Sequence, residues 1–292
     1  MRTELTIETA RPLEILSLGA GVQSSTLLLM SCSGLLPKLD VAIFADTGWE
    51  PPAIYENLEW LRQEAAAHGI PVMTVGQGRL RDDALVSRVR GRKVDGQRWA
   101  SMPLYVLGPS GERGMIRRQC TKEYKIVPIR RFIKTKLLGL TNKARFPKEV
   151  VVNHWFGISA DEAQRSRTSS DRWAMNVYPL LGIPTDLLPK PYSRRMCLDW
   201  LDREYPGRKF PRSACVGCPF HSNAEWREIA RDPVLWADAT EFDRAIRRCG
   251  GLRGEAFLHP SLKPLSGLNL RTDVDNGQGL LWNEECSGHC GV

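Results

Sequence analysis

A turn of small residues follows the first apolar stretch of the chain. Ser17-Leu18-Gly19-Ala20-Gly21-Val22-Gln23-Ser24-Ser25 lies between apolar runs at 13–18 and 26–30, an order that predicts a strand, a tight turn and a helix. Backbone N–H groups of such a turn can approach a phosphate, and the helix N-terminus adds the positive end of its dipole. The candidate phosphate-binding residues are Ser17, Gly19, Ala20, Gly21, Gln23, Ser24 and Ser25.

A pair of cysteines forms the second chemical feature. Cys215-Val216-Gly217-Cys218 places two thiols at a spacing that can hold one metal ion or part of an iron–sulfur cluster. The chain has eight cysteines, and residues 1–11 do not resemble a secretory signal, so metal binding or thiol chemistry is favoured over a disulfide framework. Spacing alone leaves zinc and an iron–sulfur cluster both open.

An acidic residue ends the second apolar run. Phe44-Ala45-Asp46-Thr47-Gly48 closes the strand expected over 41–45. Ligands of open parallel sheets bind outside the carboxyl ends of the strands, so Asp46 is expected beside the first turn. There its carboxylate could hold a ribose hydroxyl, an adenine amine or Mg²⁺. It could equally cap the following helix.

The elements that position these residues alternate between strand and helix. This alternation predicts an α/β fold with an open, mostly parallel sheet, helices on both faces and right-handed crossovers. We expect strands at 13–18, 41–45, 70–75 and 149–158, and helices at 24–32, 52–68, 122–138, 194–204 and 223–246. Residues 76–115 are irregular, with a hairpin expected near 104–115.

The domain division is placed at a proline-rich stretch. Residues 179–191 contain four prolines and are typical of a linker. We therefore expect a nucleotide-binding domain over 1–185 and a mainly helical, cysteine-rich subdomain over 186–292 that binds the metal.

The composition favours an anionic partner. Forty-one Lys and Arg against 33 Asp and Glu give a net charge of +8. This charge suits a nucleotide, a nucleic acid or both. No apolar run is long enough to span a membrane, and we expect a cytoplasmic protein without a membrane partner.

The order of the motifs resembles the phosphoadenosine phosphosulfate reductase / ATP pyrophosphatase superfamily. Gly19–Ser24, Asp46-Thr47-Gly48 and Arg118-Gln119-Cys120-Thr121-x-x-Tyr124-Lys125 occur in the family's order. Gly157-Ile158-Ser159-x-Asp161-Glu162-x-x-x-Arg165 is similar to a further family element. The family's loop is usually S-G-G-K-D-S, whereas Val22 and Gln23 stand here for lysine and aspartate. The chain thus resembles a divergent branch similar to DNA phosphorothioation-type sulfurtransferases.

The resemblance implies a set of site residues. It implies ATP and Mg²⁺ as ligands, with charge that the family lysine would supply coming from arginines or the metal ion. The implied catalytic residues are Ser24, Asp46, Arg118 and Arg165. Beyond the first turn, the implied nucleotide contacts are Asp46, Thr47, Gly48, Gly157, Ile158 and Asp161.

The resemblance also extends the metal site. Relatives with a 4Fe-4S cluster take ligands from the upstream cysteine element and from the downstream pair, which implies Cys120, Cys215 and Cys218. The fourth ligand is open: Cys197 is favoured for its nearness in sequence, and Cys286 or Cys290 is the alternative. Zn²⁺ is the alternative to the cluster.

Three functions remain open at the level of sequence. The preferred one is an ATP pyrophosphatase that adenylates DNA or tRNA for sulfur insertion, with a cysteine desulfurase as sulfur donor. The second is a sulfonucleotide reductase that forms sulfite, because Glu285-Cys286-Ser287-Gly288-His289 partly resembles the reductase tail. The third is a non-catalytic nucleotide sensor in a defence complex. Assembly as a homo-oligomer is also open.

Overall fold

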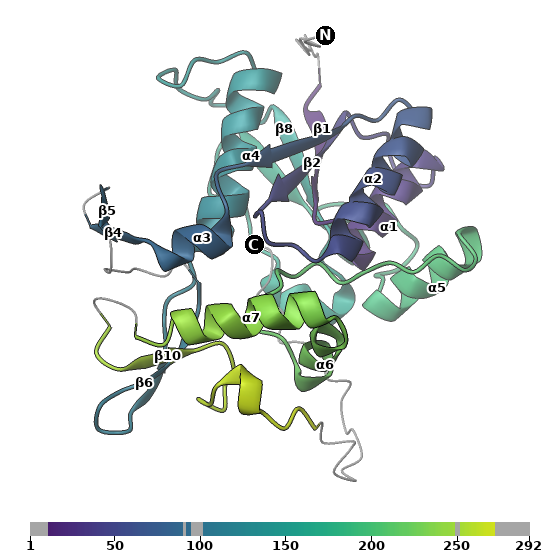
Figure 1. Cartoon of the computed structure of the whole chain (residues 1–292). Helices are drawn as coiled ribbons and strands as arrows, with labels where there is room; N and C mark the ends of the chain where they lie inside the picture. The colour runs from purple at the N-terminus through teal and green to yellow at the C-terminus, as the bar shows by residue number, and fades with distance from the viewer. Residues whose placement is uncertain (1–10, 90–91, 95–101, 249–251, 272–292) are drawn as a thin grey trace. The chain divides into compact units, whose positions relative to one another are not determined.

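The chain forms two compact units, each assembled from separate segments (Figure 1). The structure is a computed structural model that describes residues 11–89, 92–94, 102–248 and 252–271. The first unit takes residues 1–46, 52–76 and 125–213, and the second takes 47–51, 77–124 and 214–292. This grouping differs from a division at residue 185, because the proline-rich stretch packs into the first unit, where Leu180 and Leu188 are buried.

A parallel sheet is the frame of the first unit. Its five strands lie in the order β3-β2-β1-β8-β9, and each neighbouring pair is parallel. The strands are β1 (Leu13–Leu18), β2 (Val41–Asp46), β3 (Val72–Gly76), β8 (Val152–Phe156) and β9 (Ala174–Val177). The order reverses between β1 and β8, which is where open parallel sheets bind their ligands. The expected α/β fold is confirmed at this level.

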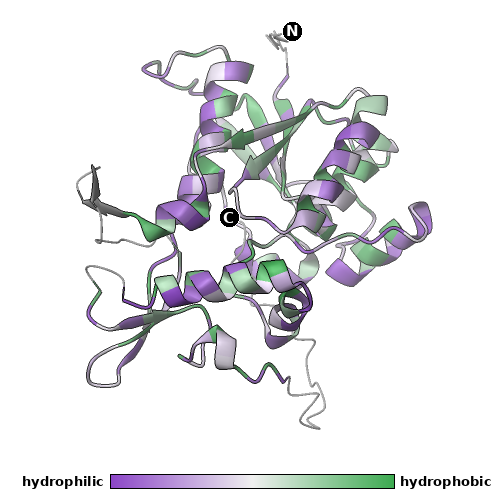
Figure 2. Cartoon of the chain, in the orientation of Figure 1, coloured by the Kyte–Doolittle hydropathy of each residue, from purple (hydrophilic) through white to green (hydrophobic). Residues whose placement is uncertain are grey.

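Helices cover both faces of this sheet (Figure 1). One face packs on α1 (Val22–Cys32), α2 (Pro52–Ala67) and α5 (Arg194–Glu204). The other packs on α4 (Val127–Phe132) and the π-helical turn η2 (Ile133–Leu137). Successive strand residues point to opposite faces, so both faces of the central strands are apolar, as the green strands of Figure 2 show.

The second unit mixes helices with antiparallel strands. Its three-stranded sheet has the order β10-β6-β7, and β4 pairs with β5 separately. The strands are β4 (Ser87–Val89), β5 (Arg92–Val94), β6 (Tyr105–Leu107), β7 (Arg113–Met115) and β10 (Glu255–Phe257). The hairpin expected near 104–115 is confirmed as β6–β7. The tail strand β10 joins it through long-range pairing that a sequence pattern does not show.

The second unit contains the helices α3 (Leu80–Leu85), α6 (Asn223–Arg231) and α7 (Pro233–Ala245). Side chains cap the N-termini of α6 and α7, whereas Arg79, the N-cap of α3, makes no side-chain cap hydrogen bond. The single helix expected over 223–246 is in fact two. Asp232 accepts hydrogen bonds from the backbone N–H groups of Val234 and Leu235, and Pro233 occupies the first helical position.

The chain also contains short segments of π- and 3₁₀-helix. They are η1 (Thr121–Ile126), η3 (Ala160–Arg165), η4 (Pro179–Leu181) and η5 (Leu265–Gly267). None of the helices in the described ranges combines the length and the apolar character needed to cross a membrane.

Candidate nucleotide site and cysteine turn

The turn after β1 passes through a left-handed residue. Ala20 has φ of +53° and is fully buried, and Gly21 precedes α1 in extended conformation. The Ser24 hydroxyl closes the turn: it accepts from the Gly19 N–H at 3.1 Å and donates to the Gly21 carbonyl at 3.3 Å. The N-cap residue Gly21 makes no side-chain cap hydrogen bond, so it leaves the N–H groups of the first turn of α1 without a cap of that kind.

Strand β8 leads directly to this turn at Gly157. A Cβ atom on Gly157 would lie 2.9 Å from the Ser24 backbone nitrogen and 3.1 Å from the Gln23 carbonyl carbon. Both are backbone atoms, so only glycine lets the two segments come this close. The structure thus brings two separately expected elements together at the reversal point of the sheet.

Ser213 packs against the turn from another side. A Cβ on Gly19 would lie 2.9 Å from the Ser213 hydroxyl oxygen, and a Cβ on Gly21 would lie 2.8 Å from the Ser213 nitrogen. Packing against Ser213 therefore favours glycine at both positions, most strongly at Gly21, where a close neighbour is a backbone atom.

Asn57 of α2 forms hydrogen bonds to the turn after β1. Its side chain is 2% exposed, and its Nδ2 donates to the Ala20 carbonyl at 2.9 Å and to the Ser25 hydroxyl at 3.3 Å. Its Oδ1 accepts from Arg208 at 3.1 Å, and the Arg208 guanidinium lies 3.7 Å from the centre of the Trp60 ring. This network holds the backbone carbonyl of Ala20 in place.

The two positions that depart from the family loop have different surroundings. Val22, at the lysine position, is 1% exposed within the apolar core. Gln23, at the aspartate position, donates to Glu162 Oε2 at 3.5 Å, and Glu162 Oε1 pairs with Arg165 at 2.5 Å. Arg165 is therefore joined to the turn through one carboxylate, in a position to bring positive charge near it.

Asp46 lies at the carboxyl end of β2, as expected. It accepts a hydrogen bond from the Tyr55 hydroxyl at 2.8 Å, which orients the carboxylate. Asp161 accepts from the backbone N–H of Arg194 at 2.5 Å and so also holds the start of α5. Ile158 has its side chain buried, so any contact with a ligand would come from its backbone.

Ser17 faces the opposite side of the sheet from its neighbours Leu16 and Leu18. Its hydroxyl lies 2.7 Å from Nε2 of His154 on β8. Burial lowers the pKa of His154 to about 4, so the ring is neutral at pH 7. The Ser17–His154 pair therefore ties β1 to β8 directly beneath the reversal point without adding charge.

The Asp-Thr-Gly element is divided between the two units. Asp46 ends β2, whereas Thr47 and Glu50 belong to the second unit, where both are buried. The Thr47 hydroxyl donates to Glu50 Oε1 at 3.0 Å and lies 3.3 Å from the Cys215 sulfur. The same sulfur lies 3.6 Å from Glu50 Oε1. Gly48, with φ of +68°, packs against Arg79.

The cysteine pair forms a tight turn on this segment. The Cys218 N–H donates to the Cys215 carbonyl at 3.0 Å, and His221 Nε2 lies 2.9 Å from that carbonyl. A Cβ on Gly217 would lie 2.0 Å from the Trp49 ring, so the turn can rest on the indole only with glycine. The Val216 N–H donates to the Trp49 carbonyl at 2.9 Å.

The remaining described cysteines have distinct environments. Cys120 packs against the same apolar cluster as Cys215. Cys197 is fully buried in the core of the first unit, and burial raises the pKa of its thiol to about 12. Cys32 is partly exposed on α1. Cys286 and Cys290 lie outside the described residues.

The described donors do not by themselves make a metal centre. Within the described ranges, no three His, Cys, Asp or Glu side chains are grouped so that they could hold one ion. The two-cysteine turn would need ligands from elsewhere in the chain to fit a cluster or zinc.

The implied site residues fall into both units. Ser24, Asp46, Gly157, Asp161 and Arg165 belong to the first unit, whereas Arg118 belongs to the second. No protein-family model matches the chain, and no curated protein shows significant similarity to it.

Sequence reasoning missed several residues that build these sites. Asn57 could have been found as a polar residue three positions after Ile54, on the apolar face of α2. His154, Ser213 and Glu50 carry no such signal, because only the fold brings them to Ser17, the turn and Cys215.

Proposed function

We propose that this chain is an ATP pyrophosphatase-type enzyme. ATP would bind with its phosphates at the turn after β1 and its nucleoside near Asp46. The enzyme would adenylate a nucleic acid, releasing pyrophosphate, and sulfur would then displace AMP. The observation that supports the proposal is the close packing of Gly157 on the backbone of Ser24 at the reversal point of a parallel sheet, because ligands of open parallel sheets bind at such a point.

The proposed roles follow from the contacts. The N–H groups at the start of α1 would hold a phosphate, and the Ser24 hydroxyl would turn from the loop backbone to the same anion. Arg165, held by Glu162, would offset charge that develops on the phosphates, together with Mg²⁺. Asp46, oriented by Tyr55, would bind the ribose, the adenine or Mg²⁺.

The catalytic proposal predicts a loss of pyrophosphate release in two variants. Ser24→Ala and Asp46→Ala should each lower the rate of ATP-dependent release by about 10²-fold, since each removes a group aimed at the reacting nucleotide. Release is measured with Mg²⁺, with and without duplex DNA or tRNA.

Matched controls come from the same part of the chain. Ser33→Ala at the other end of α1 and Asp202→Ala on α5 change exposed side chains of the same types and should leave the rate unchanged. Unchanged release in the Ser24 and Asp46 variants would show that the turn is not catalytic. Nucleotide binding without release by the natural protein would support the sensor, and sulfite formed from a sulfonucleotide would support the reductase.

We further propose that Cys120, Cys215 and Cys218 ligate a 4Fe-4S cluster, with Zn²⁺ as the alternative. Cys215 and Cys218 share one turn, and Cys120 packs on the same apolar cluster, although the three thiols are not grouped around one position in the described structure and would have to converge on the metal. The fourth ligand would be Cys197, which is buried in the core of the first unit, with Cys286 or Cys290 as the alternative. A cysteine desulfurase would supply the sulfur.

The cluster proposal predicts iron and sulfide in protein purified without oxygen. Cys215→Ser or Cys218→Ser should reduce bound iron to near zero, because a cluster needs its thiolate ligands. Cys32→Ser is the control and should retain full iron content. If the purified protein is colourless and contains one zinc ion, the metal is zinc and not an iron–sulfur cluster. If Cys215→Ser leaves the metal content unchanged, the Cys215–Cys218 turn does not bind the metal.

A further inference from the structure

One stretch of the first unit carries an excess of positive charge. Between residues 130 and 148 there are seven Lys and Arg and no Asp or Glu. This stretch covers the end of α4, η2 and the connection to β8. Its exposed cations, here called the basic ridge, are Arg131, Lys136, Lys143, Arg145 and Lys148. None of the five pairs with a carboxylate in the described ranges.

The backbone that presents the ridge is held in place. Phe146 stacks on Trp173 at 4.2 Å between ring centres, and Arg130 lies 5.1 Å from the Phe146 ring while it pairs with Asp171. The Lys134 ammonium donates to the Asn142 carbonyl at 2.7 Å. Arg130 and Lys134 therefore hold the connection against the helix through these contacts. The five cations of the basic ridge remain exposed on this ordered backbone.

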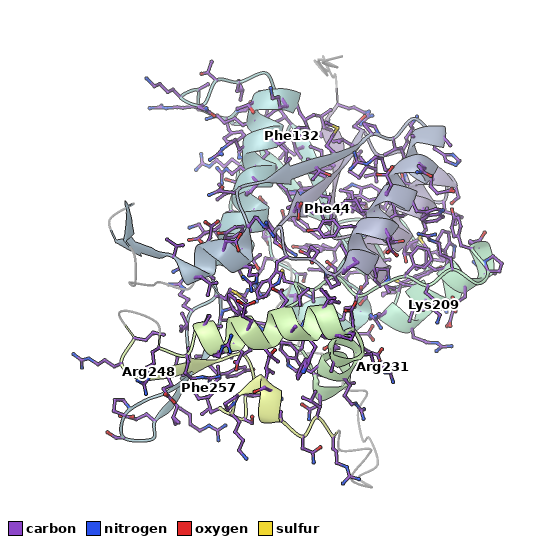
Figure 3. The ribbon with its side chains drawn as sticks, viewed as in Figure 1. Phe44, Phe132, Lys209, Arg231, Arg248 and Phe257 are labelled. Carbon is purple, nitrogen blue, oxygen red and sulfur yellow. The ribbon has the colours of Figure 1, made fainter. Side chains whose placement is uncertain are left out.

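The basic ridge lies at the opposite end of the sheet from the turn after β1. It precedes β8, and the Leu13 N–H at the start of β1 bonds to Val151, the residue next to β8. The turn instead follows the far end of β1. Figure 3 labels Phe132 on the helix, and long nitrogen-tipped side chains project from the connection beyond it. A six-residue strand spans about 20 Å, so one ligand reaching both places must be at least that long.

We propose that the basic ridge binds the phosphate backbone of a polymeric nucleic acid. This inference rests on the proposed function and narrows its substrate. A ligand that contacts the ridge while reacting at the turn spans about six or more base pairs, which a free sulfonucleotide cannot do. The ridge would position the polymer through charge without reading its sequence, because cations on a surface contact phosphates rather than base edges.

The test measures binding of a fluorescent 30-base-pair duplex and of tRNA over a series of salt concentrations. The variant Lys143→Gln/Arg145→Gln/Lys148→Gln removes three ridge charges from exposed positions. The slope of log affinity against log salt should become shallower by about 2 to 3, and affinity should fall at least tenfold. Pyrophosphate release from ATP without nucleic acid should not change, because these residues are remote from the turn.

The matched control removes the same charge elsewhere. Arg195→Gln/Arg203→Gln/Arg231→Gln changes three exposed arginines that already pair with Asp199, Glu204 and Glu228. It should alter affinity less than threefold. Equal losses in both variants, or an unchanged slope in the ridge variant, would overturn the inference.

Other outcomes separate this inference from the proposed function. If the natural protein binds neither nucleic acid but still releases pyrophosphate, the ridge inference fails and the nucleotide site stands. Binding to vesicles of anionic lipid, with none to DNA or tRNA, would likewise overturn it in favour of a membrane surface. If both polymers bind through the ridge but no pyrophosphate is released, the inference holds and the catalytic proposal fails.

Discussion

Replacing Gly157 with alanine is expected to weaken nucleotide binding by about 100-fold. The new Cβ would lie 2.9 Å from the Ser24 nitrogen and 3.1 Å from the Ser24 Cα, and all its nearest neighbours are backbone atoms that no rotamer change can move. Either β8 or the start of α1 must shift. A displacement of about 1 Å at a site of this kind costs roughly 10²-fold in function.

The stability cost of this change should be smaller than its functional cost. Overpacking by one methyl group typically costs about 1–3 kcal/mol, which corresponds to a fall of a few degrees in Tm. Binding of ATP is measured by calorimetry, and Tm is measured without ligand. Gly114→Ala is the control, since no atom lies within 4 Å of its Cβ position and both quantities should be unchanged. Normal ATP affinity in Gly157→Ala would show that the nucleotide lies elsewhere.

Replacing Asn57 with alanine is expected to destabilise the turn and weaken nucleotide binding together. The Ala20 carbonyl would lose its buried donor at 2.9 Å, and Arg208 would lose its acceptor. An unsatisfied buried group costs about 1–3 kcal/mol, and this cost applies to the fully buried Ala20 carbonyl. Arg208 is only partly buried, so its lost acceptor adds less. Affinity for ATP should fall at least tenfold. The left-handed backbone of Ala20 is strained, and without Asn57 no side-chain hydrogen bond would hold its carbonyl in place.

A second substitution separates the hydrogen bonding of Asn57 from general packing. Glycine adopts positive φ without strain, so Ala20→Gly in the Asn57→Ala background should recover part of the ATP affinity while Tm stays low. Ala20→Gly alone should change affinity little. The exposed Gln63→Ala on α2 is the control for helix substitution. If Ala20→Gly restores no ATP affinity in the Asn57→Ala background, Asn57 acts only through packing. The prediction that it holds the backbone of Ala20 would then be wrong.

Local patterns predicted the elements of the first unit well. Leu13–Leu18 is a strand with the expected bounds, and α5 spans 194–204 as expected. Buried parallel strands are apolar on both faces, and the turns between them need small residues, so both signals are local. One local signal was misread: Pro233 divides the helix expected over 223–246. The proline-rich stretch also buries Leu180 and Leu188 in the core of the first unit.

The division into units could not be predicted in the same way. Segments 47–51 and 77–124 leave the first unit and join residues beyond 213. Such grouping depends on contacts such as β10 with β6, and on the hydrogen bond from the Trp49 indole to Asp238 at 2.6 Å. These partners lie far apart in sequence, and no periodicity connects them.

The opening turn shows what each level determined. The sequence by itself determined its residue types and its place between a strand and a helix, because glycine, serine and apolar periodicity act locally. Only the tertiary structure decided that Gly157, Asn57 and Ser213 surround it and that Val22 faces the core. Those neighbours are set by the order of strands in the sheet, which depends on long-range packing rather than on any single segment.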